Sequence, residues 1–377
     1  MPALLPHVDP DGLLEYSVVY TDRALNHMSK KFGGVMRDIS GILKGAYQAH
    51  AVAVVPGSGS FGMEAVARQF ATGQRVLVIR NGWFSYRWSQ IFEMGHIPSQ
   101  PTVLRAAKTG PDATAPYAPP ALDEVLATIA REKPAVVFAP HVETSAGMIL
   151  PDSYLKAVAD AAHAVGGLFV LDCIASGCAW VDMQATGVDL LVSAPQKGWS
   201  GPPCAGFVMF SERAHRAIES TTSSSFAIDL KKWLQIMATF ESGAHAYHAT
   251  MPTESLVVAR DVMAETRDFG YAQASAAQWE LGRRVRALMA ELKLPSVAAD
   301  GFQAPGVVVS YTADPAWQNG SRFMAEGLQI AAGVPLALDE GPDFRTFRLG
   351  LFGLDKLKHI DRTVAPLDAV LRKLASA

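Results

Sequence analysis

The segment DLLVSAPQKGWSGPPCAGFVMF (residues 189–210) places a lysine between two apolar runs. The runs at 189–194 and 206–210 are too short for helices and have the composition of buried strands. Lys197 follows the first run and precedes a Gly/Pro-rich turn. Burial at such a strand end disfavours the charged ammonium and so favours the free amine that forms an imine. The alternative interpretation is an ordinary lysine in a surface loop.

Outward from this segment, apolar strand candidates alternate with helical stretches. The helical candidates are GMEAVARQFA, LDEVLATIAREK and SYLKAVADAAHAVG. This alternation predicts an α/β fold with a mostly parallel sheet covered by helices on both faces. Ligands of such sheets bind beyond the carboxyl ends of the strands. The remaining strand candidates of this region are AVAVV (51–55), RVLVI (75–79), AVVFAP (135–140) and LFVLD (168–172).

The pattern changes after about residue 265. AQWELGRRVRALMAELK predicts a long amphipathic helix, and two further strand candidates and a closing helix near 359–375 follow it. A chain of 377 residues is long for a single core, so we expect two domains. The two strand candidates are GVVVSY (306–311) and FRLGLFG (347–353). The expected division is an N-terminal arm (1–20), a large domain (21–265) and a smaller C-terminal α/β domain (266–377).

The bulk composition is that of an ordinary soluble globular protein. With a net charge of −3, nothing indicates the basic face that a nucleic-acid partner needs. No apolar run reaches the ~18 residues of a membrane helix, and the first residues do not resemble a secretory signal. The three cysteines form no C-x-x-C pair, which fits a reducing compartment. We therefore expect a cytoplasmic protein with no membrane partner.

A glycine-rich segment, PGSGSFGMEA (56–65), directly follows the first strand candidate. Its glycines permit a close backbone approach, and a helix that begins there offers free N–H groups to a phosphate. Ser58 and Ser60 can add hydroxyl donors. The G-x-G-x-x-G pattern at 57–62 also matches a dinucleotide fingerprint. That fold requires an acidic residue at the end of the next strand, which here reads RVLVIRNG (75–82). A tight turn without a ligand is the remaining alternative.

An aspartate stands at the carboxyl end of another apolar strand, in LFVLDCIASG (168–177). A lone carboxylate is costly there unless it meets a cation, and a protonated pyridine nitrogen is such a cation. The alternative for Asp172 is a helix-capping or loop residue. Lys197 follows Asp172 by 25 residues. The glycine-rich segment 56–65, here called the phosphate cup, is thus followed along the chain by Asp172 and then by Lys197. Each is expected at the end of a strand of one sheet.

These residues resemble the class V aminotransferases, which have fold type I of the pyridoxal-phosphate enzymes. The similarity is greatest to the alanine–glyoxylate, serine–glyoxylate and 2-aminoethylphosphonate–pyruvate group, over about residues 45–260 and again at 347–353. The resemblance implies a mostly parallel seven-stranded sheet in the large domain. It also implies pyridoxal 5′-phosphate bound to Lys197 as a Schiff base, and a homodimer with shared active sites.

The resemblance assigns roles to individual residues around the cofactor. The resemblance implies that Phe84 packs on one face of the pyridine ring and Ile174 on the other. Trp83 is the alternative to Phe84. Thr144 and Asp172 would contact the ring's polar groups, and Arg348 would clamp the substrate carboxylate. The alternative for Arg348 is a surface ion pair. The phosphate ligands implied are Ser58, Gly59, Ser60, Gln196 and, across the dimer interface, Tyr247 and Thr250.

The function expected from these features is transamination between an alanine- or serine-like donor and a small 2-oxo acid such as glyoxylate or pyruvate. A lyase or cysteine desulfurase of the same fold is the first alternative. In those enzymes a histidine normally precedes the lysine and a reactive cysteine lies in a late loop, whereas here Gln196 precedes it and no cysteine follows Cys204. A nicotinamide-dependent oxidoreductase and a non-catalytic binding module are the others. No metal is expected.

Overall fold

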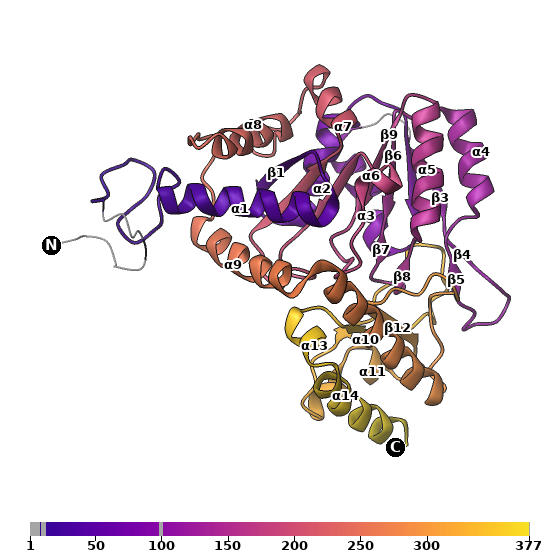
Figure 1. The fold of residues 1–377 in the computed structure, drawn as a ribbon. Helices are drawn as coiled ribbons and strands as arrows, with labels where there is room; N and C mark the ends of the chain where they lie inside the picture. The colour runs from indigo at the N-terminus through magenta and orange to yellow at the C-terminus, as the bar shows by residue number, and fades with distance from the viewer. Residues whose placement is uncertain (1–7, 9–12, 98–100, 377) are drawn as a thin grey trace.

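The computed structural model describes residues 8, 13–97 and 101–376, and its largest element is a seven-stranded sheet (Figure 1). All strand pairs are parallel except those that β11 makes with its two neighbours, which are antiparallel. The prediction of a mostly parallel sheet is therefore confirmed. In spatial order the strands are β1 (Ala51–Pro56), β11 (Ala205–Phe210), β10 (Leu190–Ser193), β9 (Leu168–Asp172), β6 (Val136–Pro140), β2 (Val76–Arg80) and β3 (Pro101–Arg105).

Helices cover this sheet, and the expected helices at 62–71, 122–133 and 153–166 are present. Helix α2 packs on β10 and β11, α3 packs on β2 and β6, and α5 packs on β9 with α4 beside it (Figure 1). The helices of this part are α1 (Lys30–Tyr47), α2 (Gly59–Phe70), α3 (Trp83–Gly95), α4 (Leu122–Glu132), α5 (Asp152–Ala164), α6 (Met183–Thr186), α7 (Glu212–Ala217), α8 (Leu230–Glu241) and α9 (Thr253–Phe269), with a 3₁₀ turn at Ile218–Ser220.

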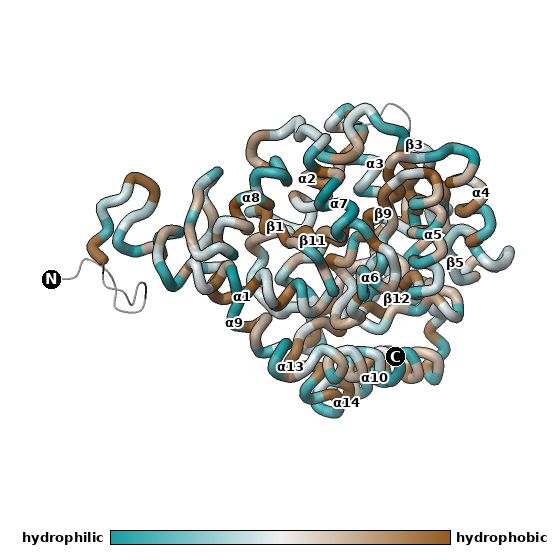
Figure 2. Tube along the Cα trace, turned by 45° about the horizontal axis from the view of Figure 1, so that its top comes forward, coloured by the Kyte–Doolittle hydropathy of each residue, from teal (hydrophilic) through white to brown (hydrophobic). Residues whose placement is uncertain are grey.

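The central strands are apolar except at their carboxyl ends, because both faces of the sheet are covered. Every residue of β6, β9, β10 and β11 is buried, and the tube in Figure 2 is brown along β9 and β11. This continuous burial is characteristic of a parallel sheet between two helix layers. Two short hairpins accompany the sheet: β4 (Ala107–Lys108) with β5 (Tyr117–Ala118), and β7 (Val142–Glu143) with β8 (Met148–Ile149).

The C-terminal part of the chain has a separate antiparallel sheet, in the order β12 (Val307–Tyr311), β14 (Thr346–Gly350), β13 (Ala331–Ala332). Both expected strands and the closing helix are present, and this part lies below the large sheet in Figure 1. Its helices are α10 (Tyr271–Glu291), α11 (Pro315–Gln318), α12 (Ser321–Ala325), α13 (Leu354–Lys358) and α14 (Ile360–Ala375). The division at residue 265 stays a prediction: that residue lies inside α9, and α9 gives way to α10 at Gly270, where φ is +100°.

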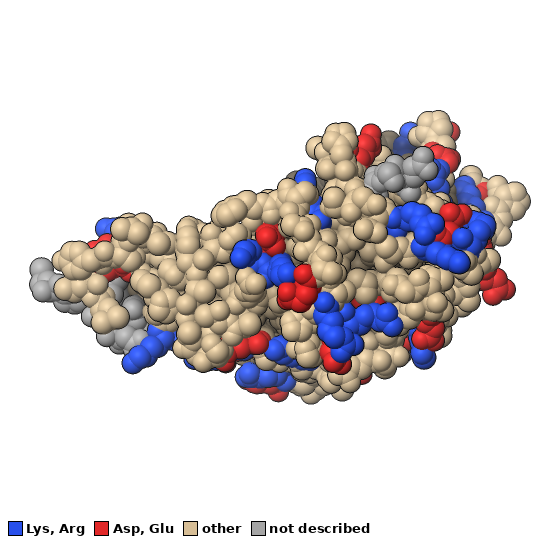
Figure 3. Space-filling model, turned by 90° about the horizontal axis from the view of Figure 1, so that it is seen from above, with Lys and Arg blue, Asp and Glu red and all other residues tan. Residues whose placement is uncertain are grey.

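The remaining described residues add two observations. Residues 13–29, which include the end of the expected arm, form no helix or strand. Within the described part of the chain, no helix is both long enough and apolar enough to cross a membrane. Acidic and basic side chains are interspersed on the face shown in Figure 3.

Candidate active site

The predicted site residues gather where parallel strands of the large sheet end. Asp172 is the last residue of β9, and Lys197 stands four residues beyond the end of β10. Phe84 follows β2 by four residues and lies in the first turn of α3. Arg348 comes from β14 of the small sheet, and its guanidinium carbon lies 5.6 Å from the centre of the Phe84 ring. Both sheets therefore contribute to one site.

Lys197 lies in a largely buried, partly aromatic environment. Its Nζ is 5.9 Å from the centre of the Phe84 ring and 5.6 Å from that of Phe352. Burial lowers the pKa of Lys197 and outweighs the opposing effect of the Asp172 carboxylate, and the nearby cations Arg348 and Arg87 lower the pKa further. Because a lowered pKa increases the share of free amine, this environment suits a nucleophilic lysine.

Asp172 is a buried carboxylate without a direct ion pair. Only 7% of the residue is exposed, and its Oδ1 accepts a hydrogen bond from the Ile174 backbone N–H at 2.9 Å. No described residue forms an ion pair with it. Burial raises the pKa of Asp172 to about 6. Lys197 and Arg87 lower this pKa only in part and form no ion pair with Asp172. The protonated ring nitrogen of pyridoxal phosphate would therefore suit this buried carboxylate as a partner.

The walls of the site near Asp172 also fit a planar polar ring. Thr144 is buried, and its Oγ1 has no hydrogen-bond partner among the described groups. A buried hydroxyl without a partner is costly, so its position is suited to a polar group of a ligand. Ile174 lies against Gly59, where a Cβ atom would come within 2.4 Å of the Ile174 Cδ1. A side chain at position 59 would require Ile174 to move.

The first turn of α2 carries the residues that are predicted to bind the cofactor's phosphate. Ser58 is its N-cap residue, and the Ser58 side chain makes no capping hydrogen bond, which leaves its hydroxyl available. The turn approaches β11 closely, since a Cβ on Gly206 would lie 2.9 Å from the Gly62 nitrogen. The Ser60 Oγ accepts a hydrogen bond from Arg87 at 2.9 Å. Gln196, beside the lysine, is exposed.

Tyr247 and Thr250 lie in the segment between α8 and α9. The Tyr247 hydroxyl is 3.1 Å from the Thr250 Oγ1, and the Tyr247 ring is 5.5 Å from that of His27. Among the described contacts, none joins either residue to the first turn of α2. Within one protomer they are thus not brought to the phosphate cup, and their contact with a partner's phosphate stays a prediction.

Phe84 and its neighbour Trp83 have different surroundings. Phe84 has Lys197, Arg87 and Arg348 around its ring, at 5.3–5.9 Å from the ring centre. The Trp83 ring instead packs against Tyr86, with 5.8 Å between ring centres. The geometry favours Phe84 as the aromatic residue that faces the lysine.

Two charged residues of the site were not predicted from the sequence. Glu143 is fully buried, and its carboxylate accepts hydrogen bonds from the backbone N–H groups of Phe84 and Ser85, from the Ser85 hydroxyl, and from Ser145. It thereby holds the first turn of α3 in place. Arg87 lies between Ser60 and the Phe84 ring. Neither residue stands out in the sequence, and only packing shows what each one contacts.

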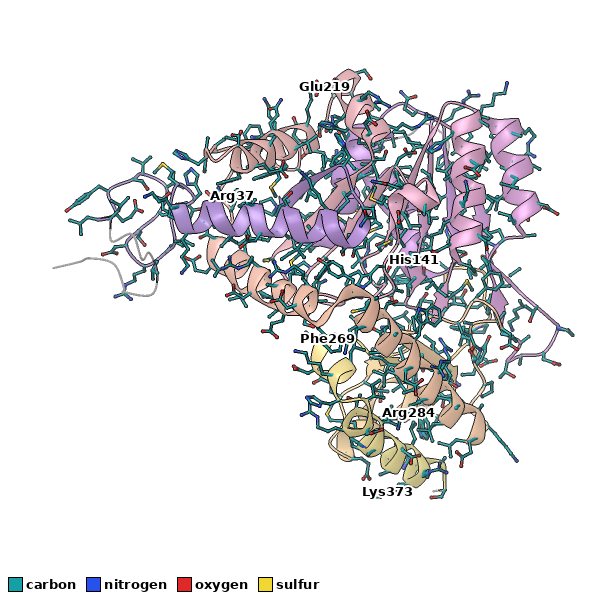
Figure 4. The ribbon with its side chains drawn as sticks, in the orientation of Figure 1. Arg37, His141, Glu219, Phe269, Arg284 and Lys373 are labelled. Carbon is teal, nitrogen blue, oxygen red and sulfur yellow. The ribbon has the colours of Figure 1, made fainter. Side chains whose placement is uncertain are left out.

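A histidine in the same region, His141, is buried and has the environment of a structural residue. His141 lies in the interior at the carboxyl end of β6 (Figure 4), and its Nδ1 is 2.7 Å from the Ser176 Oγ. Burial lowers the pKa of His141 to about 3. The ring is therefore neutral at physiological pH.

The large parallel sheet, with a buried lysine and aspartate at its carboxyl edge, defines a protein of fold type I, a class that uses pyridoxal phosphate. A solved alanine–glyoxylate aminotransferase from Nostoc sp. has the same fold, with a TM-score of 0.77 at 20% identity over 92% of this chain and 88% of its own. The sequence profile of the family described as Aminotransferase class-V matches residues 113–333. The chain belongs to this family, and it is a pyridoxal-phosphate-dependent aminotransferase.

Two curated relatives match nearly the whole chain at low identity. The rabbit (Oryctolagus cuniculus) alanine–glyoxylate aminotransferase is 25% identical over 364 residues, which are 94% of this chain and 88% of the relative. A protein named the small subunit of soluble hydrogenase, from Synechococcus sp. (strain PCC 6716), is 26% identical over 361 residues, 93% of this chain and 88% of the relative. At this identity the relatives support the family and leave the substrates open.

Proposed function

We propose that the protein transfers an amino group from an alanine- or serine-like amino acid to a small 2-oxo acid such as glyoxylate or pyruvate. The observation that carries this proposal is that Lys197 and Arg348 both lie at the Phe84 ring, while Asp172 is close enough to Lys197 to raise its pKa. The names of the alanine–glyoxylate aminotransferases among its relatives support the donor and the acceptor.

The residues present fit pyridoxal phosphate. The first turn of α2, with Ser58, Gly59 and Ser60, would hold the phosphate, and Arg87 would add a positive charge beside it. Thr144 and Asp172 would meet the polar groups of the ring. When bound, the cofactor supplies an electrophilic carbon for the amine and a ring that accepts electrons.

Each of the reacting residues has a defined task. The Lys197 amine would accept the proton from the α-carbon of the donor and would later give it back, so one nitrogen would serve first as base and then as acid. Asp172 stays ionised next to the ring nitrogen and stabilises its proton. Arg348 binds the α-carboxylate through its guanidinium and orients the α-hydrogen toward Lys197.

The cysteine desulfurase alternative requires a reactive thiolate. All three cysteines, at 173, 178 and 204, are buried. Burial raises the pKa of Cys178 to about 12 and that of Cys204 to about 11, so these thiols stay protonated at neutral pH. The chain also has Gln196 directly before the lysine. These observations favour transamination.

A donor panel tests the proposal. L-alanine or L-serine, mixed with the purified holoenzyme, should abolish the visible absorption band of the cofactor, and glyoxylate or pyruvate should restore it. Ethylamine, which has no carboxylate for Arg348, is the matched control and should have little effect. Release of sulfide from L-cysteine, without amination of an oxo acid, would instead support the desulfurase.

A further inference from the structure

Two arginines stand side by side at the outer edge of the large sheet. Arg80 is the last residue of β2 and Arg105 is the last residue of β3, and the two are paired in register across these parallel strands. Residues paired in this way direct their side chains to the same face of the sheet. Like charges at adjacent positions repel each other, so this arrangement needs negative charge nearby.

Arg80 is buried and has no ion-pair partner. Only 6% of the residue is exposed, and its guanidinium donates one hydrogen bond, to the Ser89 Oγ at 2.8 Å. The Tyr86 ring covers it, with 4.5 Å between the guanidinium carbon and the ring centre. The Nε has no partner, and no carboxylate of the described residues is within ion-pair distance. A buried, unpaired guanidinium is among the most costly groups in a protein.

Both arginines line one cavity of about 710 Å³ between α3 and β3. Besides them it is lined by the polar residues Tyr86, Ser89 and His96 and by two carboxylates, Glu93 and Asp339. Asp339 forms an ion pair with Arg105 at 2.6 Å, and its side chain is 86% exposed. Ion pairs this exposed contribute little to stability, so Asp339 is a weak and displaceable counterion.

We propose that this cavity binds a small dianion of the phosphate type, held between the guanidinium groups of Arg80 and Arg105. Two arginines present several N–H donors to the oxygens of one anion, a pairing that is both strong and specific. The anion would form the ion pair that Arg80 lacks, and it would replace Asp339 as the ion-pair partner of Arg105.

This site is separate from the cofactor's phosphate cup, which lies at α2 on the other side of α3. Residues that line the proposed anion site are nevertheless close in sequence to residues of the active site. Arg80 is followed directly by the turn that leads to Phe84, and Asp339 lies in the segment between β13 and β14, ahead of Arg348. The inference does not depend on which donor or acceptor the enzyme uses.

Calorimetric titration of the holoenzyme with inorganic phosphate tests the proposal, because the bound cofactor already fills the phosphate cup. Chloride at the same ionic strength controls for screening. We expect saturable binding to one site per chain. Arg105→Gln should weaken it about tenfold or more, since one charge-assisted pair is lost. Arg131→Gln, at an arginine whose ion pair with Glu132 is also exposed, should leave it unchanged.

Two further variants fix the location of the bound phosphate. Asp339→Asn should tighten binding by up to about fivefold, because it removes the competing carboxylate. Arg348→Ala should have no effect, since that arginine belongs to the substrate site. Phosphate that binds no better than chloride, or binding that Arg348→Ala abolishes and Arg105→Gln leaves intact, would overturn the proposal. Arg80→Gln is less suitable, since a buried substitution can prevent folding.

Discussion

At the scale of single residues, the burial of Asp172, the residue proposed to meet the cofactor's ring nitrogen, has a cost in stability. A pKa that rises from its usual 3.8 to about 6 in the folded chain corresponds to about 3 kcal/mol. The folded state binds the proton more tightly than the unfolded state. The free energy of unfolding therefore falls as pH rises through this window, and the loss is complete above pH 6.

Asp172→Asn should therefore stabilise the cofactor-free protein at about pH 7.5 and lower its activity. The neutral amide has no charge to desolvate, and it cannot stabilise a protonated ring nitrogen. Urea unfolding of the cofactor-free protein at about pH 4 and about pH 7.5 measures the difference. Asp112→Asn, at an exposed turn, is the control. If Asp172→Asn and the wild-type protein have equal free energies of unfolding at both pH values, and the variant keeps full turnover, Asp172 is only a structural residue.

Arg348→Ala should lower kcat/KM by a factor on the order of 10² or more for carboxylate-bearing donors and acceptors alike. Two charge-assisted hydrogen bonds to the α-carboxylate would be lost, at about 1.5–3 kcal/mol each. Cofactor binding should change little. Arg345→Ala, three residues earlier in the chain, is the matched control. If both half-reactions keep their efficiency in Arg348→Ala, the carboxylate is bound elsewhere.

The residues that the sequence could not predict are those whose roles arise from tertiary packing. Lys197 and Asp172 could be proposed because each ends an apolar strand, and the ends of parallel strands meet. Arg87 carries no such signal: it is a surface-like arginine in a helix until folding places it beside Ser60. Arg80 also carries no such signal: in the sequence it is only part of a strand end, RVLVIRNG (75–82), that lacks an acidic residue.

At the scale of elements, the position of α3 depends on Glu143. Its carboxylate accepts hydrogen bonds from both the backbone and the side chain of Ser85, and from the Phe84 N–H. An anion at a helix N-terminus also interacts favourably with the helix dipole. Glu143 thus determines where the Phe84 ring lies relative to Lys197.

Glu143→Ala should reduce the free energy of unfolding by about 3 kcal/mol, since several buried donors lose their acceptor. It should also weaken cofactor retention, because Phe84 is no longer held. Glu143→Gln keeps one acceptor oxygen and should recover part of both losses. Urea unfolding and cofactor absorbance provide the two readouts. A Glu143→Ala protein with unchanged stability would rule out this anchoring role.

Most strands could be predicted because central parallel strands are uniformly apolar. The edge strand β3 was missed because its sequence, PTVLR, begins with proline and is only partly buried. Helices α1, α3, α8 and α9 were also missed. α3, for instance, is rich in aromatic residues, has only a modest amphipathic pattern and depends on a carboxylate from another segment. Whether such helices form depends on contacts with residues that are distant in the sequence.

At the scale of the whole molecule, the account predicts a two-fold dimer. Tyr247 and Thr250 do not reach the phosphate cup of their own protomer, so their expected role requires a partner. Light scattering of the holoenzyme should give twice the chain mass, and Tyr247→Phe should weaken cofactor retention without preventing folding. Tyr16→Phe, at an exposed tyrosine of the N-terminal segment, serves as the control. A fully active monomer would contradict shared sites.

The central claim is that Lys197 carries the cofactor. Borohydride reduction of the holoenzyme, followed by peptide mapping, tests this most directly because reduction makes the linkage permanent. We expect the pyridoxyl group on the peptide that contains Lys197. The Lys197→Ala variant should give no labelled peptide. A label on any other lysine of the wild-type chain would contradict it.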